Sequence, residues 1–138
     1  MQVAKVTKYK IAFLFLLIVI FLGYYFFYSK HKIQSLLKNH IISKGYTFDY
    51  TPGTSYKNNP PSIIYKYHVG NLEFKGSTQL YDISAADIQS KLINKNFAVA
   101  IDSTDFSNSM ILISPKAFSD MNMVYPDSLS WISSLVKE

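Results

Sequence analysis

An uninterrupted apolar run occupies residues 11–28, in which no residue is charged and none is more polar than Tyr. As an α-helix this run rises about 27 Å, close to the ~30 Å hydrocarbon core of a bilayer. A cleaved signal peptide has a shorter apolar core followed by small residues, whereas this run leads into the bulky segment YYFFYSKHK. The pattern therefore predicts an uncleaved, single-pass signal-anchor helix whose partner is the lipid bilayer.

Apolar residues continue at helical spacing beyond this run. Ile33, Leu36, Leu37 and Ile41 follow that period, and Gly45 is a typical helix stop. The apolar stripe of such a helix is expected to pack on the sheet that follows. We therefore predict a short basic tail over 1–10, a transmembrane helix over 11–28, an amphipathic stalk helix over 29–45 and a folded domain over 46–138.

The clearest strand pattern lies on either side of Gly70 and Asn71, a pair suited to a two-residue type II′ turn. Alternating residues over 62–69 and 72–81 predict an antiparallel hairpin with one core face and one solvated face. Its expected register pairs Val69 with Leu72, Tyr67 with Phe74, Tyr65 with Gly76, His68 with Glu73, and Lys66 with Lys75. The last is a like-charge pair, which disfavours this register.

The remaining elements are short. Residues 46–50 form a predicted strand, and Ser84 with Asp87 resembles a capping box that opens a helix over 85–94. Two nearly continuous apolar segments, 97–101 and 109–113, predict central strands covered on both faces. Ser114 and Pro115 begin another helix, and a final amphipathic segment follows Pro126. The fold class is therefore α+β, with a small, mostly antiparallel sheet and one or two short helices.

The excess of positive over negative charge lies entirely beside the apolar run. Five Lys and no acid occur through residue 32, whereas nine Lys and nine acids cancel from Ile33 onward. All basic residues are Lys, so the bidentate guanidinium fork that reads phosphates and guanine edges is missing, and we expect no nucleic-acid partner. A short N-terminal tail usually stays in the cytoplasm, which predicts an extracytoplasmic domain in a bacterial envelope.

Residues that carry chemistry are sparse. No Cys is present, and the three His (His31, His40 and His68) are scattered along the chain. The most oxygen-rich loop, from Asp102 to Asp105, lacks the ligand number and the glycine of an EF-hand. Nucleophile elbows and glycine-rich phosphate loops are also missing. We therefore expect no catalytic, cofactor-binding or metal-binding residues, no cofactor, and a protein that is not an enzyme.

The C-terminal third resembles a group of short, uncharacterised bacterial single-span membrane proteins. The resemblance rests on Asn96-Phe97-x-Val99, Asn108-Ser109-x-Ile111-Leu112-Ile113, Ser114-Pro115-x-x-Phe118 and Tyr125-Pro126-Asp127-Ser128-Leu129-x-Trp131. Ala98 stands where such proteins tend to have Pro, and Asp105-Phe106 replaces an Asn-Pro. The resemblance implies the anchored fold and transfers no functional residue.

Three classes of function remain open. The first is a membrane-anchored protein-interaction or accessory module whose partner is a membrane or envelope protein. The second is a structural pilin-like subunit, which predicts a Glu inside the apolar run, and residues 11–28 contain none. The third is a ligand-binding or enzymatic domain without a recognisable motif, which predicts a pocket lined by His68, Asp102 or Asp105.

Overall fold

A computed structural model describes residues 2–54 and 59–135, and the chain divides into two units, Met1–Gln34 and Ser35–Glu138. Helix α1 (Gln2–Lys38) makes up the first unit, and its last turn belongs to the second. Within α1, the segment Ile11–Lys38 is long and apolar enough to cross a membrane. None of the residues in its most apolar stretch is buried in the structure. The side chains of residues 11–28 are all exposed.

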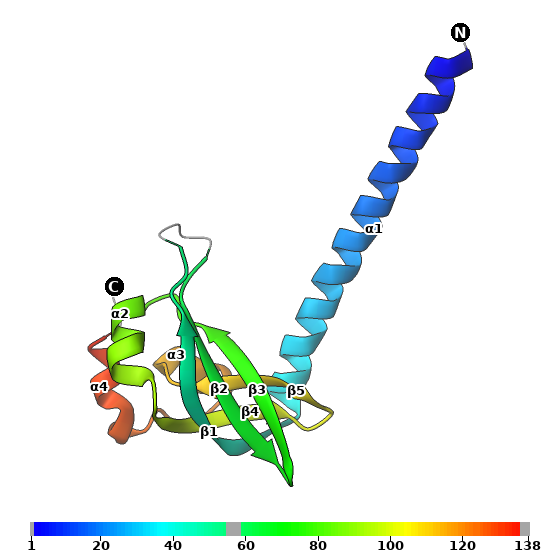
Figure 1. Ribbon diagram of the computed structural model, residues 1–138. Helices are drawn as coiled ribbons and strands as arrows, with labels where there is room; N and C mark the ends of the chain where they lie inside the picture. The colour runs from blue at the N-terminus through cyan, green and yellow to red at the C-terminus, as the bar shows by residue number, and fades with distance from the viewer. Residues whose placement is uncertain (1, 55–58, 136–138) are drawn as a thin grey trace. The chain divides into compact units, whose positions relative to one another are not determined.

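The second unit has the predicted α+β fold, built on one five-stranded antiparallel sheet of order β3-β2-β1-β4-β5 (Figure 1). Strand β1 is central in that order and pairs with both β2 and β4. The strands are β1 (His40–Thr51), β2 (Ser62–Val69), β3 (Leu72–Gln79), β4 (Asn96–Asp102) and β5 (Asp105–Leu112).

The β2–β3 hairpin has the register predicted from the sequence. All five expected pairs are present, from Val69 with Leu72 at the turn to Tyr65 with Gly76. Gly70 has a φ of 59°, and Asn71 is not among the residues of positive φ. A positive φ at the first central residue alone is the signature of a type II′ turn, which the Gly-Asn pair predicted.

The stalk helix predicted over 29–45 is wrong beyond Lys38, where α1 ends. Residues His40 to Tyr46 instead form one ladder with β4, from His40 opposite Asp102 to Tyr46 opposite Asn96. Ile41 and Ile42 are β-branched and suit a strand, so the long-range ladder overrides the local helical period. Residues 2–10, predicted as a tail, are helical as well.

The predicted buried stripe of this stalk is also mostly wrong. Leu36 alone among its members is buried, whereas Ile33, Leu37 and Ile41 are 57%, 36% and 44% exposed. Gly45, expected to stop the helix, instead lies buried inside β1. A side chain at this position would collide with Val99, whose side chain occupies the space where a Cβ would be. Its absence of a side chain serves close packing between strands rather than helix termination.

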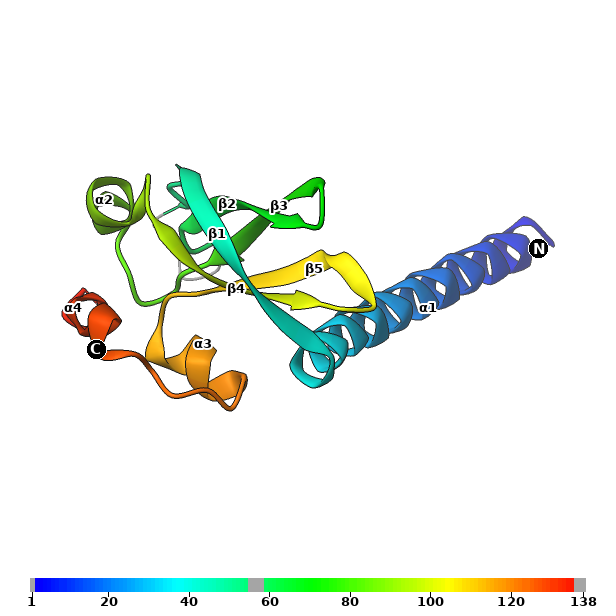
Figure 2. The ribbon, with the colours of Figure 1, turned by 90° about the horizontal axis from the view of Figure 1, so that it is seen from below.

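Short helical elements cover the sheet on both faces. The inner face packs against Ile88 and Leu92 of η1 and Ile132 of α4 in one core cluster. The outer face of β4 and β5 packs against Leu36 and Phe118 in a second cluster. Both views place α2 and α4 at the same end of the domain (Figures 1 and 2). The elements are α2 (Ala85–Asp87), η1 (Ile88–Leu92), α3 (Pro115–Asp120), η2 (Asp127–Leu129) and α4 (Ser130–Ser133).

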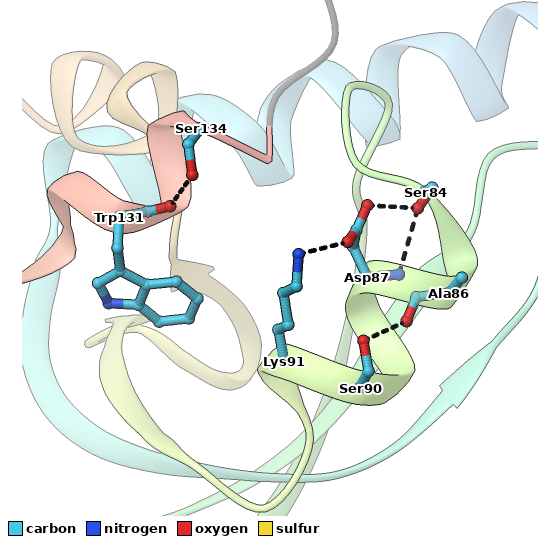
Figure 3. Close-up of polar contacts among 7 residues, drawn as sticks. All are labelled: Ser84, Ala86, Asp87, Ser90, Lys91, Trp131 and Ser134. Atoms are coloured by element: carbon cyan, nitrogen blue, oxygen red, sulfur yellow. Dashed lines mark hydrogen bonds and ion pairs between the residues drawn. The ribbon is translucent and has the colours of Figure 1, made fainter.

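The helix predicted over 85–94 begins as expected at a capping box (Figure 3). Asp87 donates its backbone N–H to Ser84 Oγ at 3.2 Å, and Ser84 Oγ donates to the Asp87 carboxylate at 2.6 Å. The same carboxylate pairs with Lys91 Nζ at 2.8 Å. After one α-helical turn the backbone becomes π-helical over Ile88–Leu92. Asn94, in the left-handed region at φ 60°, ends this segment.

Strands β4 and β5 are covered on both faces as predicted, but the prediction that both are central is wrong for β5. It stands last in the strand order. The sheet curls so far that β5 contacts β3, the strand at the opposite edge. Curling buries Ile111 and Leu112, which point to opposite faces of β5, without placing β5 inside the sheet.

Tyrosine hydroxyls connect the two edges across what we call the β3–β5 seam, where the described residues form no ladder. The Tyr65 hydroxyl lies 3.3 Å from Thr78 Oγ1 on β3 and 3.1 Å from Ser109 Oγ on β5. The Tyr67 hydroxyl donates to the Phe106 carbonyl at 2.7 Å. Burial raises the pKa of both phenols, so they remain protonated donors at neutral pH.

Replacing Tyr65 by Phe tests the seam. The change leaves the ring in place but removes the partner shared by Thr78 and Ser109, which should lower the free energy of unfolding by about 1–3 kcal/mol. Urea unfolding of the full chain in detergent, followed by the fluorescence of Trp131, measures the loss. Tyr81→Phe is the matched control, because Tyr81 is 69% exposed and should change stability by less than about 0.5 kcal/mol. Equal effects of the two changes would contradict the role of the seam.

Candidate interaction surface

The outer face of the sheet is covered over β4 and β5 but open over β1, β2 and β3. Burial alternates along β2, where Ile63, Tyr65 and Tyr67 are buried and the residues between them are not. We call the uncovered part the open sheet face. It is formed by Ile42, Lys44 and Tyr46 of β1, Ile64, Lys66 and His68 of β2, and Glu73 and Lys75 of β3.

Cross-strand pairing arranges part of this face into a row. Tyr46 lies opposite Asn96 of β4 on one side and opposite Lys66 on the other, and Lys66 lies opposite Lys75. The like-charge pair is tolerated because Glu73 Oε2 lies 3.4 Å from Lys66 Nζ. Lys75 Nζ meanwhile stands 5.6 Å from the ring centroid of Phe48. Both contacts offset the repulsion that disfavoured this register.

Two clefts adjoin the open sheet face and share Lys44 and Asn96. The first has a volume of about 370 Å³ and is lined by Tyr46, Lys66 and His68 among others. The second, of about 410 Å³, runs toward the C-terminal segment and is mainly apolar; its lining includes Phe97, Ala98, Phe118, Pro126 and Leu129. The surface therefore offers a polar, Lys-containing part and an apolar groove side by side.

The sequence did not show how unevenly charge is distributed over this formally neutral domain. Lys91 and Lys116 pair with Asp87 and Asp120 within their own helical segments. Lys95 Nζ stands 4.3 Å from the centroid of the Trp131 ring. Lys44, Lys66 and Lys75 instead share one side of the sheet, where Glu73 pairs with Lys66. The open sheet face is thus more basic than the domain average.

Asp102, a candidate ligand from the oxygen-rich loop, instead stabilises the fold through hydrogen bonds to its own domain. It is 1% exposed and lies at the end of β4, opposite His40. Its carboxylate accepts hydrogen bonds from the Thr104 backbone N–H at 2.9 Å, Thr104 Oγ1 at 2.7 Å and Asn108 Nδ2 at 3.1 Å. Ser35, in the last turn of α1, is a further donor. These bonds tie residues 35–38 to the turn between β4 and β5.

Burial alone would raise the pKa of Asp102, but the hydrogen bonds from Ser35, Thr104 and Asn108 outweigh it and hold the pKa well below its usual value. An unfolded Asp titrates near a pKa of about 3.9. Because the folded-state pKa lies below that value, the carboxylate stabilises the fold above about pH 4, and this contribution is lost as the pH falls further.

The other candidates from the sequence do not converge. Asp105 binds the Ser107 backbone N–H and hydroxyl inside its own turn. His68 lies 3.6 Å from Glu73 on the open sheet face and lines a cleft, the feature expected of a ligand-binding domain. That cleft contains neither Asp102 nor Asp105. His40 Nδ1 lies 3.2 Å from the Leu37 carbonyl oxygen. Among the residues that the structure describes, no three His or carboxylate residues form a group able to hold a metal.

Comparison with known proteins found no matching family model, no similar curated protein and no similar solved structure.

Replacing Asp102 by Asn tests the role of its carboxylate. Asn offers one acceptor oxygen to several donors, so the free energy of unfolding at pH 7 should fall by about 2 kcal/mol. The difference from wild type should be smaller at pH 3, where the wild-type carboxylate has lost part of its contribution. Urea unfolding at both pH values measures this. Asp127→Asn, an exposed control, should change stability by less than about 0.5 kcal/mol. A pH-independent loss would show that ionisation of Asp102 is irrelevant.

Proposed function

We propose that the protein is a single-pass membrane protein that holds its α+β domain outside the cytoplasm and binds another membrane or envelope protein. The open sheet face is the binding surface. The bilayer holds the chain through residues 11–28, and the domain supplies recognition rather than catalysis.

The exposed apolar side chains of α1 support the membrane anchor. Phe15, Phe21 and Leu22 are 67%, 69% and 61% exposed, whereas the core helix of a soluble protein buries such residues. Transfer of this surface from water into lipid is favourable by roughly 25 cal/mol per Å². An N-terminal signal sequence has the same composition, and the mass of the mature chain distinguishes the two, because a cleaved chain would begin after the apolar run.

The open sheet face is the observation that carries the interaction proposal. Helices cover both faces of β4 and β5, yet the outer face of β1 to β3 has no such cover among the described residues. Ile42 is 46% exposed beside the two clefts. The face combines the apolar residues Ile42 and Ile64 and the Tyr46 ring with Lys side chains. Protein interfaces typically join such an apolar centre to a polar rim. The basic character of the face favours a partner with an acidic surface.

Cysteine substitutions test anchoring and sidedness together, because the chain contains no Cys. Val124 is 90% exposed, so Val124→Cys should react in intact cells with a membrane-impermeant maleimide if the domain is extracytoplasmic. Ile18→Cys, inside the apolar run, should react only after the membrane is dissolved. Reaction of Val124→Cys only after lysis would place the domain in the cytoplasm. Reaction of Ile18→Cys in intact membranes would contradict the proposal that residues 11–28 span the membrane.

A photo-crosslinking amino acid placed at Ile42 tests the interaction. Irradiation of intact membranes should give one dominant adduct with a membrane or envelope protein. The same amino acid at Val124, which is also exposed but lies outside the open sheet face, should give much less of it. Charge reversal at Lys66 and Lys75 should weaken the Ile42 adduct by about tenfold, because two attractive charges become repulsive. Equal adducts from Ile42 and Val124 would contradict the proposed surface.

A further inference from the structure

The end of the apolar run carries a groove on the surface of α1. It has a volume of about 380 Å³ and lies wholly within the first unit. Its lining residues recur at helical spacing and therefore share one side of the helix. They are Tyr24, Phe27, Tyr28, Lys30, His31 and Gln34.

The groove changes character along the helix. Tyr24 and Tyr28 stack with ring centroids 6.2 Å apart and, with Phe27, form an aromatic wall within the apolar run. Lys30, His31 and Gln34 supply hydrogen-bond donors at the other end. Aromatic rings followed by basic groups correspond to the layers of a bilayer, in which the acyl chains are followed by the glycerol groups and then by the phosphates.

The Lys30 ammonium turns back toward the apolar run. Its Nζ lies 4.5 Å from the centroid of the Phe26 ring, one helical turn earlier. The charge is therefore held against the helix, beside the last turn of the apolar run. If α1 spans a bilayer, a cation at this position attracts a phosphate more strongly than it would in bulk water, because the surroundings contain less water.

Charge also selects among phospholipids. The first acidic residue of the sequence is Asp49, so α1 offers no carboxylate to the amine of a zwitterionic headgroup. Lys30, and His31 when protonated, instead complement a headgroup whose phosphate charge is not neutralised by an amine. We infer that this groove is a binding site for one anionic phospholipid, whose phosphate contacts Lys30 and His31 and whose glycerol region lies against Tyr24 and Tyr28.

This inference rests on the proposed function, since the groove meets lipid only if α1 spans the membrane. The full chain is reconstituted in nanodiscs of phosphatidylcholine with phosphatidylglycerol and then examined by native mass spectrometry for lipid retained per chain. One phosphatidylglycerol should be retained, about fivefold more often than phosphatidylcholine after correction for composition, the ratio expected for ~1 kcal/mol. Lys30→Gln combined with His31→Gln should lower this preference well below that of wild type, and Lys32, whose Nζ lies 5.3 Å from the Tyr28 ring centroid, keeps the remainder.

Lys8→Gln combined with Lys10→Gln is the matched control, because it removes two basic residues from the other end of the apolar run. It should keep the retained phosphatidylglycerol. Equal losses in both double variants, or equal retention of both lipids by wild type, would overturn the site while leaving the anchor intact. A chain that does not enter the nanodiscs at all would instead refute the membrane span itself.

Discussion

The domain depends on hydrogen bonds that connect its two edge strands, between which the described residues form no ladder. Tyr65 and Tyr67 project from β2 and reach β5 through their hydroxyls, and Tyr65 also reaches β3. Gly76 makes this possible, because the Tyr65 ring occupies the space that a Cβ on β3 would fill. Edge strands with unpaired backbone groups invite association with other chains, and curling the sheet until its edges meet removes much of that exposure. The same curl encloses the inner core.

Local patterns predicted the elements whose partners are close in sequence. The β2–β3 hairpin followed from Gly70 and from alternation, and the capping box at Ser84 followed from residue types three positions apart. The predicted C-terminal boundary of α1 was wrong because residues 40–46 pair with β4, whose residues lie 50 to 62 positions further along the chain. Thr47 shows the same limit. Its hydroxyl donates to the Leu92 carbonyl at 2.6 Å, and nothing in its own neighbourhood indicates a buried polar residue.

The candidate surface divides in the same way. Alternation along the hairpin was sufficient to predict a solvated face that carries Lys66, His68, Glu73 and Lys75. The clefts beside it were not predictable, because they require β1, β4 and the segment around Leu129 to meet. Asp102 illustrates a different difficulty, since a loop rich in oxygen atoms predicts a ligand site and a tightly bonded turn equally well. Only the structure distinguishes a ligand site from a turn, because it shows that Thr104 and Asn108 donate hydrogen bonds to the carboxylate.

Helix α1 leads through Asn39 directly into β1, the middle strand of the sheet. A force transmitted along the chain from α1 therefore reaches the domain through β1, which pairs with both of its neighbours at Gly45 and Tyr46. Ladder bonds run across the strand, so a pull along it loads many of them simultaneously in shear instead of opening them one after another. A pull along β1 would thus meet more resistance than a pull that opens its ladder bonds one at a time.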